Sequence, residues 1–133
     1  MDIIDSPFLK FSPDDLPRPW LPLIIGNPHT NQTINVYGLI DTGADECAVP
    51  AYYAPIIGHN LQAGVQKSIN TGNGVTIAYA HTLCFETQGI KVENVLIDFM
   101  PNLNVVLLGV KSFLSNFILT IDYKKSVFSL KHF

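Results

Sequence analysis

Short apolar runs separated by turn residues recur along the chain and predict a protein built mainly from β-strands. Each run is four to eight residues long, rich in β-branched or aromatic side chains, and bounded by Gly, Pro, Asn or Asp, a pattern typical of strands. The predicted strands are Leu21–Ile25, Thr33–Ile40, Cys47–Pro50, Val65–Ile69, Val75–Thr82, Leu83–Glu86, Ile90–Ile97, Val105–Leu108, Phe117–Asp122 and Val127–Leu130.

Turn residues between neighbouring runs predict three hairpins. The first has Asn70–Gly74 at its tip, where two Gly and two Asn favour positive φ angles, and the others turn at Gln88-Gly89 and Tyr123–Ser126. The segment Lys111–Asn116 predicts one or two helical turns, whereas residues 51–64 show no clear pattern. The pattern therefore predicts an all-β domain with one short helix near the C-terminus.

The first twenty residues differ in composition from the rest of the chain. They contain the four prolines Pro7, Pro13, Pro17 and Pro19. Each proline removes a backbone donor and restricts the residue before it. We therefore expect residues 1–20 to form a proline-rich arm, anchored by Trp20, and residues 21–133 to form the folded domain.

Composition narrows the classes of function. The 133 residues fit one domain, and 47% apolar against 14% charged residues indicates a globular core or an apolar face covered by a partner chain. A net charge of -3 without a basic stripe argues against nucleic acid as a partner. No apolar run reaches the length of a membrane span, and no signal-peptide pattern opens the chain, so we expect a cytoplasmic protein or a domain of a longer chain. Two Cys and four scattered His predict neither a disulfide framework nor a metal site.

One segment stands out for its chemistry. The strand that ends at Ile40 leads directly into Asp41, Thr42 and Gly43. A carboxylate after a buried strand is costly unless it is hydrogen-bonded. Thr42 offers a hydroxyl and Gly43 allows close approach of the backbone, so the three residues could hold a reactive carboxylate. Taken alone, the same residues could also form an ordinary Asx turn.

The residues around this motif resemble the retropepsins, the retroviral-type aspartic proteases and their cellular and bacterial relatives. The resemblance runs through Leu39–Val49, the apolar-apolar-Gly block Val105–Gly109 followed by the helix-like Lys111–Asn116, and the tail Phe117–Tyr123. The Gly-rich hairpin at Asn70–Gly74 falls where that family has its flap. The resemblance implies a closed retropepsin-like (acid protease) β-barrel.

The resemblance also implies roles for single residues. Asp41 would be the catalytic aspartate, Thr42 would join the two catalytic loops across a dimer axis, and Gly43 would offer a carbonyl to substrate. The implied substrate contacts are Ala44, Asp45, Ala48, Thr71, Gly72, Asn73, Gly74, Val105 and Leu107. Ala48, Val105 and Leu107, which would line the side-chain pockets, are apolar, so we expect apolar side chains beside the scissile bond of an extended peptide, and neither a metal nor an organic cofactor.

A second catalytic aspartate is missing from the chain. Asp98 precedes Phe-Met-Pro and Asp122 precedes Tyr-Lys-Lys, so neither repeats the motif at Asp41. A twofold homodimer would supply the second carboxylate. The expected function is a homodimeric aspartic endopeptidase. The alternatives are a retropepsin-like dimerisation or peptide-binding module with little proteolysis, and an unrelated β-barrel.

The sequence departs from the viral members of the family at one position. Those members have an arginine after the apolar-apolar-Gly block, and it pairs with the acidic residue that corresponds to Asp45. This chain has Val110 at that position, and Lys111 and Arg18 are the candidate replacements. We expect Asp45 to be exposed or bonded to backbone N–H groups.

Overall fold

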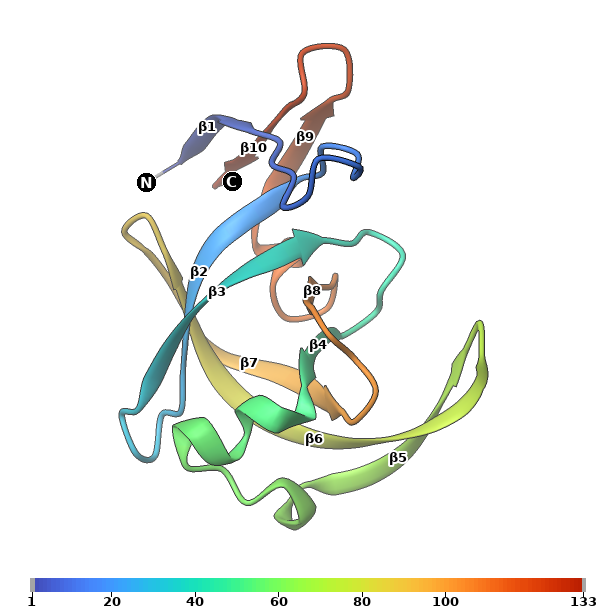
Figure 1. Cartoon of the computed structure of the whole chain (residues 1–133). Coiled ribbons are helices and arrows are strands. Elements are labelled where there is room, and N and C mark those ends of the chain that lie inside the picture. Colours follow the sequence, from blue (N-terminus) through green and yellow to red (C-terminus); the bar gives the residue numbers. More distant parts are fainter. Residues whose placement is uncertain (1, 133) are drawn as a thin grey trace.

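The computed structural model describes residues 2–132. Met1, the first residue of the predicted arm 1–20, and Phe133, the last residue of the predicted domain 21–133, lie outside the described residues. The strands are β1 (Ile3–Pro7), β2 (Trp20–Gly26), β3 (Thr33–Ile40), β4 (Cys47–Pro50), β5 (Val65–Thr71), β6 (Gly74–Thr87), β7 (Ile90–Met100), β8 (Val106–Leu108), β9 (Ile118–Asp122) and β10 (Val127–Lys131) (Figure 1). Four short 3-10 helices complete the described elements: η1 (Ala51–Tyr53), η2 (Pro55–Ile57), η3 (Leu61–Ala63) and η4 (Leu114–Asn116).

The strands form two sheets. Seven strands pair in the order β2-β3-β8-β4-β7-β6-β5, and β2 also pairs with β6, while β1, β10 and β9 form a separate three-stranded sheet. The expected mainly β architecture with a short helix near the C-terminus, here η4, is confirmed. Closure of the larger sheet into a barrel stays a prediction.

Two regions differ from the predicted elements. The two runs Val75–Thr82 and Leu83–Glu86 are one continuous strand, β6, because no turn residue separates them and the only irregularity is a register shift between Leu83 and Phe85. Residues 51–64 form three 3-10 turns, which are too short to give a periodic pattern.

The predicted arm contains a strand. β1 pairs antiparallel with β10, with Ile3 opposite Leu130, and both side chains are buried. The remaining arm residues connect β1 to β2. Within this connection, Leu9 and Arg18 form an isolated antiparallel bridge. The chain's first and last strands therefore lie side by side, and the division into an arm and a domain stays a prediction.

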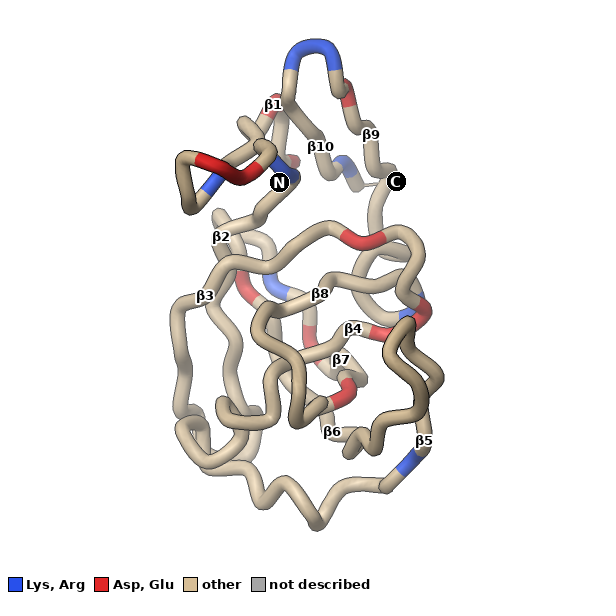
Figure 2. The backbone as a smooth tube through the Cα atoms, turned by 45° about the vertical axis from the view of Figure 1, so that its right-hand side comes forward, with Lys and Arg blue, Asp and Glu red and all other residues tan. Residues whose placement is uncertain are grey.

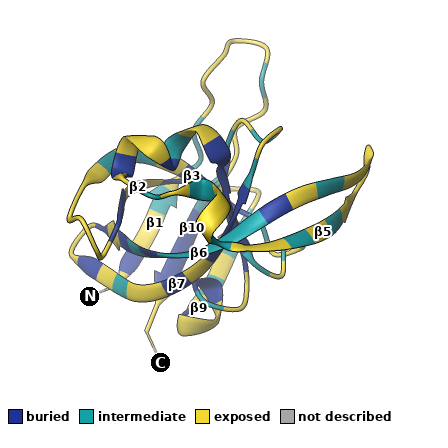
Figure 3. Ribbon diagram, turned by 90° about the horizontal axis from the view of Figure 1, so that it is seen from below, coloured by how far each residue is buried: buried dark blue, intermediate teal, exposed yellow. Residues whose placement is uncertain are grey.

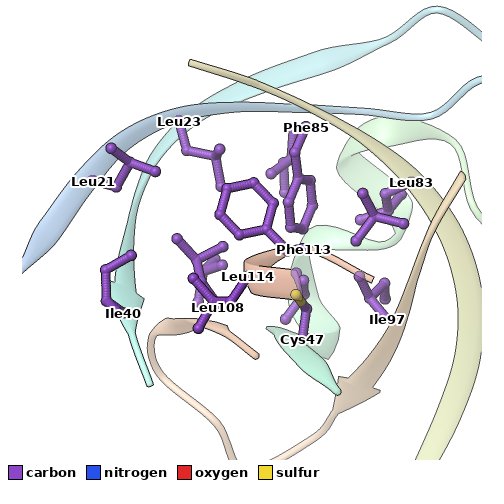
Figure 4. Packing of buried hydrophobic residues seen from close by; sticks show 14 of the residues in the cluster. Leu21, Leu23, Ile40, Cys47, Leu83, Phe85, Ile97, Leu108, Phe113 and Leu114 are labelled. Carbon is purple, nitrogen blue, oxygen red and sulfur yellow. The ribbon is translucent and has the colours of Figure 1, made fainter. Parts of the chain in front are cut away.

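The core lies between the strands of the larger sheet and the turn that carries η4. Alternate residues of β2 face inward, and Leu21 and Leu23 belong to one cluster with Phe85 of β6 and with Phe113, in which Leu23 lies beside the two rings (Figure 4). Full burial of a side chain of this size stabilises the fold by about 1.5–3 kcal/mol. In contrast, the hairpin of β5 and β6 extends from this core and is mostly exposed along its length (Figure 3).

The two hairpin turns flanking β6 differ. Gln88 and Gly89 have φ angles of 47° and 84°, as a two-residue turn between antiparallel strands requires. At the other end, the expected positive φ occurs at Gly74, with a value of 104°, and at no other residue of Asn70–Gly74. There the Thr71 hydroxyl donates to the Gly74 carbonyl over 2.9 Å and closes the tip. Within residues 2–132 we find no helix of the length and apolarity needed to cross a membrane.

Candidate active site

Strand β3 positions Asp41 at the edge of the core. The strand lies between β2 and β8, and its last residue, Ile40, is buried. The Asp41 N–H continues this pairing and donates to the Leu108 carbonyl over 3.1 Å. The backbone of Asp41 is thus fixed by a buried strand, while its side chain is half-buried and reaches the surface.

The turn after β3 holds the carboxylate through the backbone. The Gly43 N–H donates to Asp41 Oδ1 over 3.0 Å, and the Ala44 N–H donates to the Asp41 carbonyl over 3.2 Å. Thr42 is exposed, and within residues 2–132 its hydroxyl makes no hydrogen bond to the carboxylate. The predicted turn is therefore present, with the bond to the carboxylate made by Gly43 rather than by Thr42.

The segment after β8 anchors this turn. The Val110 N–H donates to the Ala44 carbonyl over 2.9 Å, and the Lys111 N–H donates to the Asp45 carbonyl over 2.8 Å. Gly109 lies so close to the turn that a Cβ there would be 2.3 Å from the Glu46 carbonyl oxygen. Only glycine fits this contact without a backbone shift.

Cys47 is packed beside the turn, as its position after the motif suggests. The Gly109 N–H donates to Cys47 Sγ over 3.3 Å. Burial raises the pKa of the Cys47 thiol to about 12. The side chain is therefore a protonated, unreactive part of the core at neutral pH.

A groove of about 550 Å³ runs between the turn and the hairpin of β5 and β6. Its lining includes five of the residues for which the sequence predicts a site role: Gly43, Ala44, Asp45, Ala48 and Leu107. Residues 68–70 of β5 form the opposite wall. The structure thus brings part of the predicted substrate-binding set together along one groove.

The other predicted residues lie around the groove. Asp41 and Thr42 line a neighbouring hollow of about 410 Å³, whose other wall includes the arm segment 16–19. Thr71 and Asn73 line a third hollow, of about 310 Å³, beside the loop after β7. The three remaining predicted residues, Gly72, Gly74 and Val105, line none of these three hollows.

The groove is more charged than the sequence suggests. Beside Ala48 and Leu107 it contains two ion pairs, Lys67–Asp98 at 2.8 Å and Lys111–Glu46 at 3.2 Å. None of these four residues is among those for which the sequence predicts a substrate contact. One signal was present for Asp98, which interrupts an otherwise apolar run between Ile97 and Phe99. The apolar residues Ala48 and Leu107 therefore share this groove with charged side chains, and the preference for apolar substrate side chains stays a prediction.

Asp45 has no side-chain ion pair among the described residues. Its candidate partners bind elsewhere, since Lys111 pairs with Glu46 and Arg18 lies 3.5 Å from Asp15. The Asp45 side chain is exposed, as expected from the valine at position 110.

Acidic residues lie along the turn after β3, whereas a basic pair occupies the turn between β9 and β10 (Figure 2).

The ring of His59 lies near two other histidines that are distant from it in sequence. The His59 ring is 4.7 Å from His81 and 6.4 Å from His29, measured between ring centroids. Burial, and then the neighbouring imidazole of His81, lower the pKa of His59. Among residues 2–132, no cluster of three or more His, Cys, Asp or Glu has an arrangement that could hold a metal ion.

Comparison with known proteins bears on the fold. A scan of protein-family models and a search of curated proteins each give no match. The crystal structure of a retropepsin-like aspartic protease from Rickettsia conorii has a TM-score of 0.69 at 21% identity, covering 98% of this chain and 90% of the other. EIAV protease complexed with the inhibitor HBY-793 has a TM-score of 0.51 at 16% identity, covering 76% and 88%. The chain therefore has a retropepsin-like fold.

Proposed function

We propose that the chain is one subunit of a homodimeric aspartic endopeptidase, in which two copies of Asp41 activate the water that hydrolyses a peptide bond. One observation carries the proposal. On a retropepsin-like fold, the Asp41 carboxylate follows a buried strand, remains half-buried and accepts a hydrogen bond from the Gly43 N–H. This arrangement keeps the carboxylate rigid and accessible, as a group that exchanges protons with a reacting water requires.

The chemistry explains why two subunits are needed. Hydrolysis requires a base that removes a proton from the attacking water and an acid that protonates the carbonyl oxygen. Two adjacent carboxylates cannot both ionise, so they share one proton and perform both roles. The sequence Asp-Thr-Gly occurs once, at Asp41, so a second copy of the chain supplies the other carboxylate.

The substrate of this proposal is an extended peptide lying in the groove between the turn and β5. Ala48 and Leu107 contact its side chains, and Asp45, which is exposed, accepts hydrogen bonds from its backbone. The hairpin tip Thr71–Gly74 covers the peptide as a flap. Backbone pairing along an extended peptide provides affinity, and the pockets for alternate side chains provide selectivity.

The first experiment is cleavage of an unfolded protein at mildly acidic pH, with and without a statine inhibitor. Asp41→Asn is the matched control, because the amide oxygen still accepts the Gly43 N–H while the group can no longer act as acid or base. We expect this variant to lose about 10²–10⁴-fold in turnover and to keep its folded spectrum. Wild-type turnover in Asp41→Asn would refute the assignment.

A second measurement tests the homodimer. Activity per subunit should rise with protein concentration and then reach a plateau, because only paired chains are active. Cleavage by a chain that remains monomeric at all concentrations would end the dimer proposal. A dimer that binds the statine inhibitor and cleaves no peptide would instead favour the binding module.

A further inference from the structure

The flap hairpin leaves the body of the protein at a defined point. Strand β6 pairs with β5 as far as Thr71 opposite Gly74, but with β7 only as far as Tyr79 opposite Phe99. From the pair Lys67 and Ala78 to the tip, β5 and β6 therefore pair only with each other, and β7 no longer borders β6. We call residues 67–78 the flap hairpin, and Figure 1 shows it curving away from the end of β7.

Among residues 2–132, one ion pair joins the start of this hairpin to the body. Lys67 Nζ lies 2.8 Å from Asp98 Oδ1, and the side chains are 37% and 5% exposed. This oxygen accepts no well-directed hydrogen bond, so the contact is an ion pair with the ammonium as its partner. A buried carboxylate without a partner is strongly unfavourable, which makes Lys67 the side chain that compensates Asp98.

The register places this pair on the face of the sheet that borders the groove. Asp98 is opposite both Ala48 of β4 and Ala80 of β6, and both Lys67 and Asp98 line the groove. The other side-chain hydrogen bonds of the flap hairpin are internal, at Thr71. Within the described residues, Lys67–Asp98 is thus the one side-chain polar contact between the flap hairpin and the body.

We propose that Lys67 and Asp98 are positioning residues that hold the flap hairpin over the groove. The inference rests on the proposed function, since a flap matters only where a peptide is bound. A flap must open to admit a peptide and close to exclude water. Lys67 is exposed enough for water to solvate its ammonium when the pair opens, whereas Asp98, fixed on β7, supplies the charge that brings the hairpin back.

Three variants separate positioning from folding. Lys67→Met leaves Asp98 without a partner and risks misfolding, so the decisive variant is Lys67→Met combined with Asp98→Leu, which removes both charges. Replacing a buried ion pair by apolar residues commonly leaves stability unchanged or improved. Lys67→Arg keeps the charge and should restore the contact. The control is Lys91→Met, which removes an exposed pair with Glu93 at the far end of β7.

Amide hydrogen exchange measures the flap without any substrate. In the double variant we expect exchange at residues 68–77 to accelerate about tenfold, while the β6–β7 ladder from Leu83 to Val95 keeps its protection. KM and the statine dissociation constant should rise about tenfold with a smaller change in kcat, because the loss falls mainly on binding. Lys67→Arg and Lys91→Met should resemble the wild type in both assays.

The outcomes separate the two proposals. Flap exchange and KM in the double variant equal to those of the wild type would overturn the positioning role. If the wild-type protein cleaves no peptide, the proposed function fails, and the exchange measurement alone decides whether the pair holds the hairpin. If Lys67→Arg behaves like the double variant, the positive charge is not what acts, and the inference fails.

Discussion

Gly109 is the residue whose substitution tests most directly how the Asp41 turn is held. A Cβ at this position would lie 2.3 Å from the Glu46 carbonyl oxygen, 2.5 Å from the Glu46 carbonyl carbon and 2.8 Å from the Ala44 carbonyl oxygen. All three are backbone atoms, which cannot rotate away as a side chain can. Gly109 does not have a positive φ, so the conflict in Gly109→Ala is purely steric.

The distances set the size of the effect. Non-bonded carbon contacts are most favourable at about 3.5–4.0 Å, so the turn or the segment after β8 must move by about 1 Å. Forcing extra volume into a packed site costs about 1–3 kcal/mol. A loss of about 2 kcal/mol lowers the ratio of folded to unfolded protein about 30-fold. With a urea dependence of about 1–3 kcal/mol per molar for a domain of this size, the unfolding midpoint falls by about 1 M.

The assay is urea unfolding of Gly109→Ala beside Gly72→Ala. The second variant is the matched control, because a Cβ at Gly72 would meet nothing within 4 Å and its φ is not positive. Its midpoint should stay unchanged or rise slightly, since alanine restricts the unfolded chain. A Gly109→Ala midpoint equal to that of Gly72→Ala would refute the tight contact between Gly109 and the turn.

Three further predictions concern other parts of the molecule. His59 has a lowered pKa in the folded protein, so at pH values between that pKa and about 6.5 the unfolded state binds more protons than the folded state. The free energy of unfolding should therefore fall as the pH drops through this range. In thermal melts from pH 7 to 5, His59→Gln should weaken this dependence. Burial raises the pKa of both thiols, so iodoacetamide should label half-buried Cys84 slowly and Cys47 only on unfolding. Rapid labelling of Cys47 in the folded protein, measured by mass spectrometry, would contradict its packing. Val110→Arg should tighten the proposed dimer in sedimentation experiments, and a gain that persists with Asp45→Asn would show that the two residues do not pair.

Local chemistry explains why much of the fold was predictable. The strand Thr33–Ile40 has the bounds that its β-branched and aromatic residues indicate. The turn at Gln88-Gly89 adopts the positive φ angles that its glycine permits. These features depend on residues that are neighbours in sequence, so each leaves a short and readable pattern.

Long-range pairing explains what the sequence did not reveal. The partner of Ile3 is Leu130, at the opposite end of the chain, and β1 lies within a proline-rich segment that gave no strand pattern. The ion pair of Lys67 with Asp98 likewise joins residues of different strands. Such contacts arise from the order of strands in the sheet, which apolar periodicity does not encode.

At Val110 this chain lacks the arginine of the viral retropepsins, and other contacts connect the turn after β3 with the segment after β8. In the viral retropepsins that the sequence resembles, an arginine at this position pairs with the acid corresponding to Asp45. In this chain an ion pair joins the next residue of each segment, Lys111 and Glu46. The two segments are also joined by backbone bonds from Val110 to Ala44 and from Lys111 to Asp45, which do not depend on the side chain at position 110.

This arrangement has a consequence for the proposed substrate contact. An acid paired with arginine uses some of its lone pairs for the guanidinium, and an incoming peptide N–H must bond to those that remain. The Asp45 side chain is exposed, and Val110, at the position of the viral arginine, has no donor in its side chain. Because exposed ion pairs contribute only about 0–1 kcal/mol, the chain loses little stability by leaving Asp45 unpaired. Under the proposed function, Asp45 therefore accepts hydrogen bonds from a peptide backbone in the groove, whose lining also contains the Lys111–Glu46 pair.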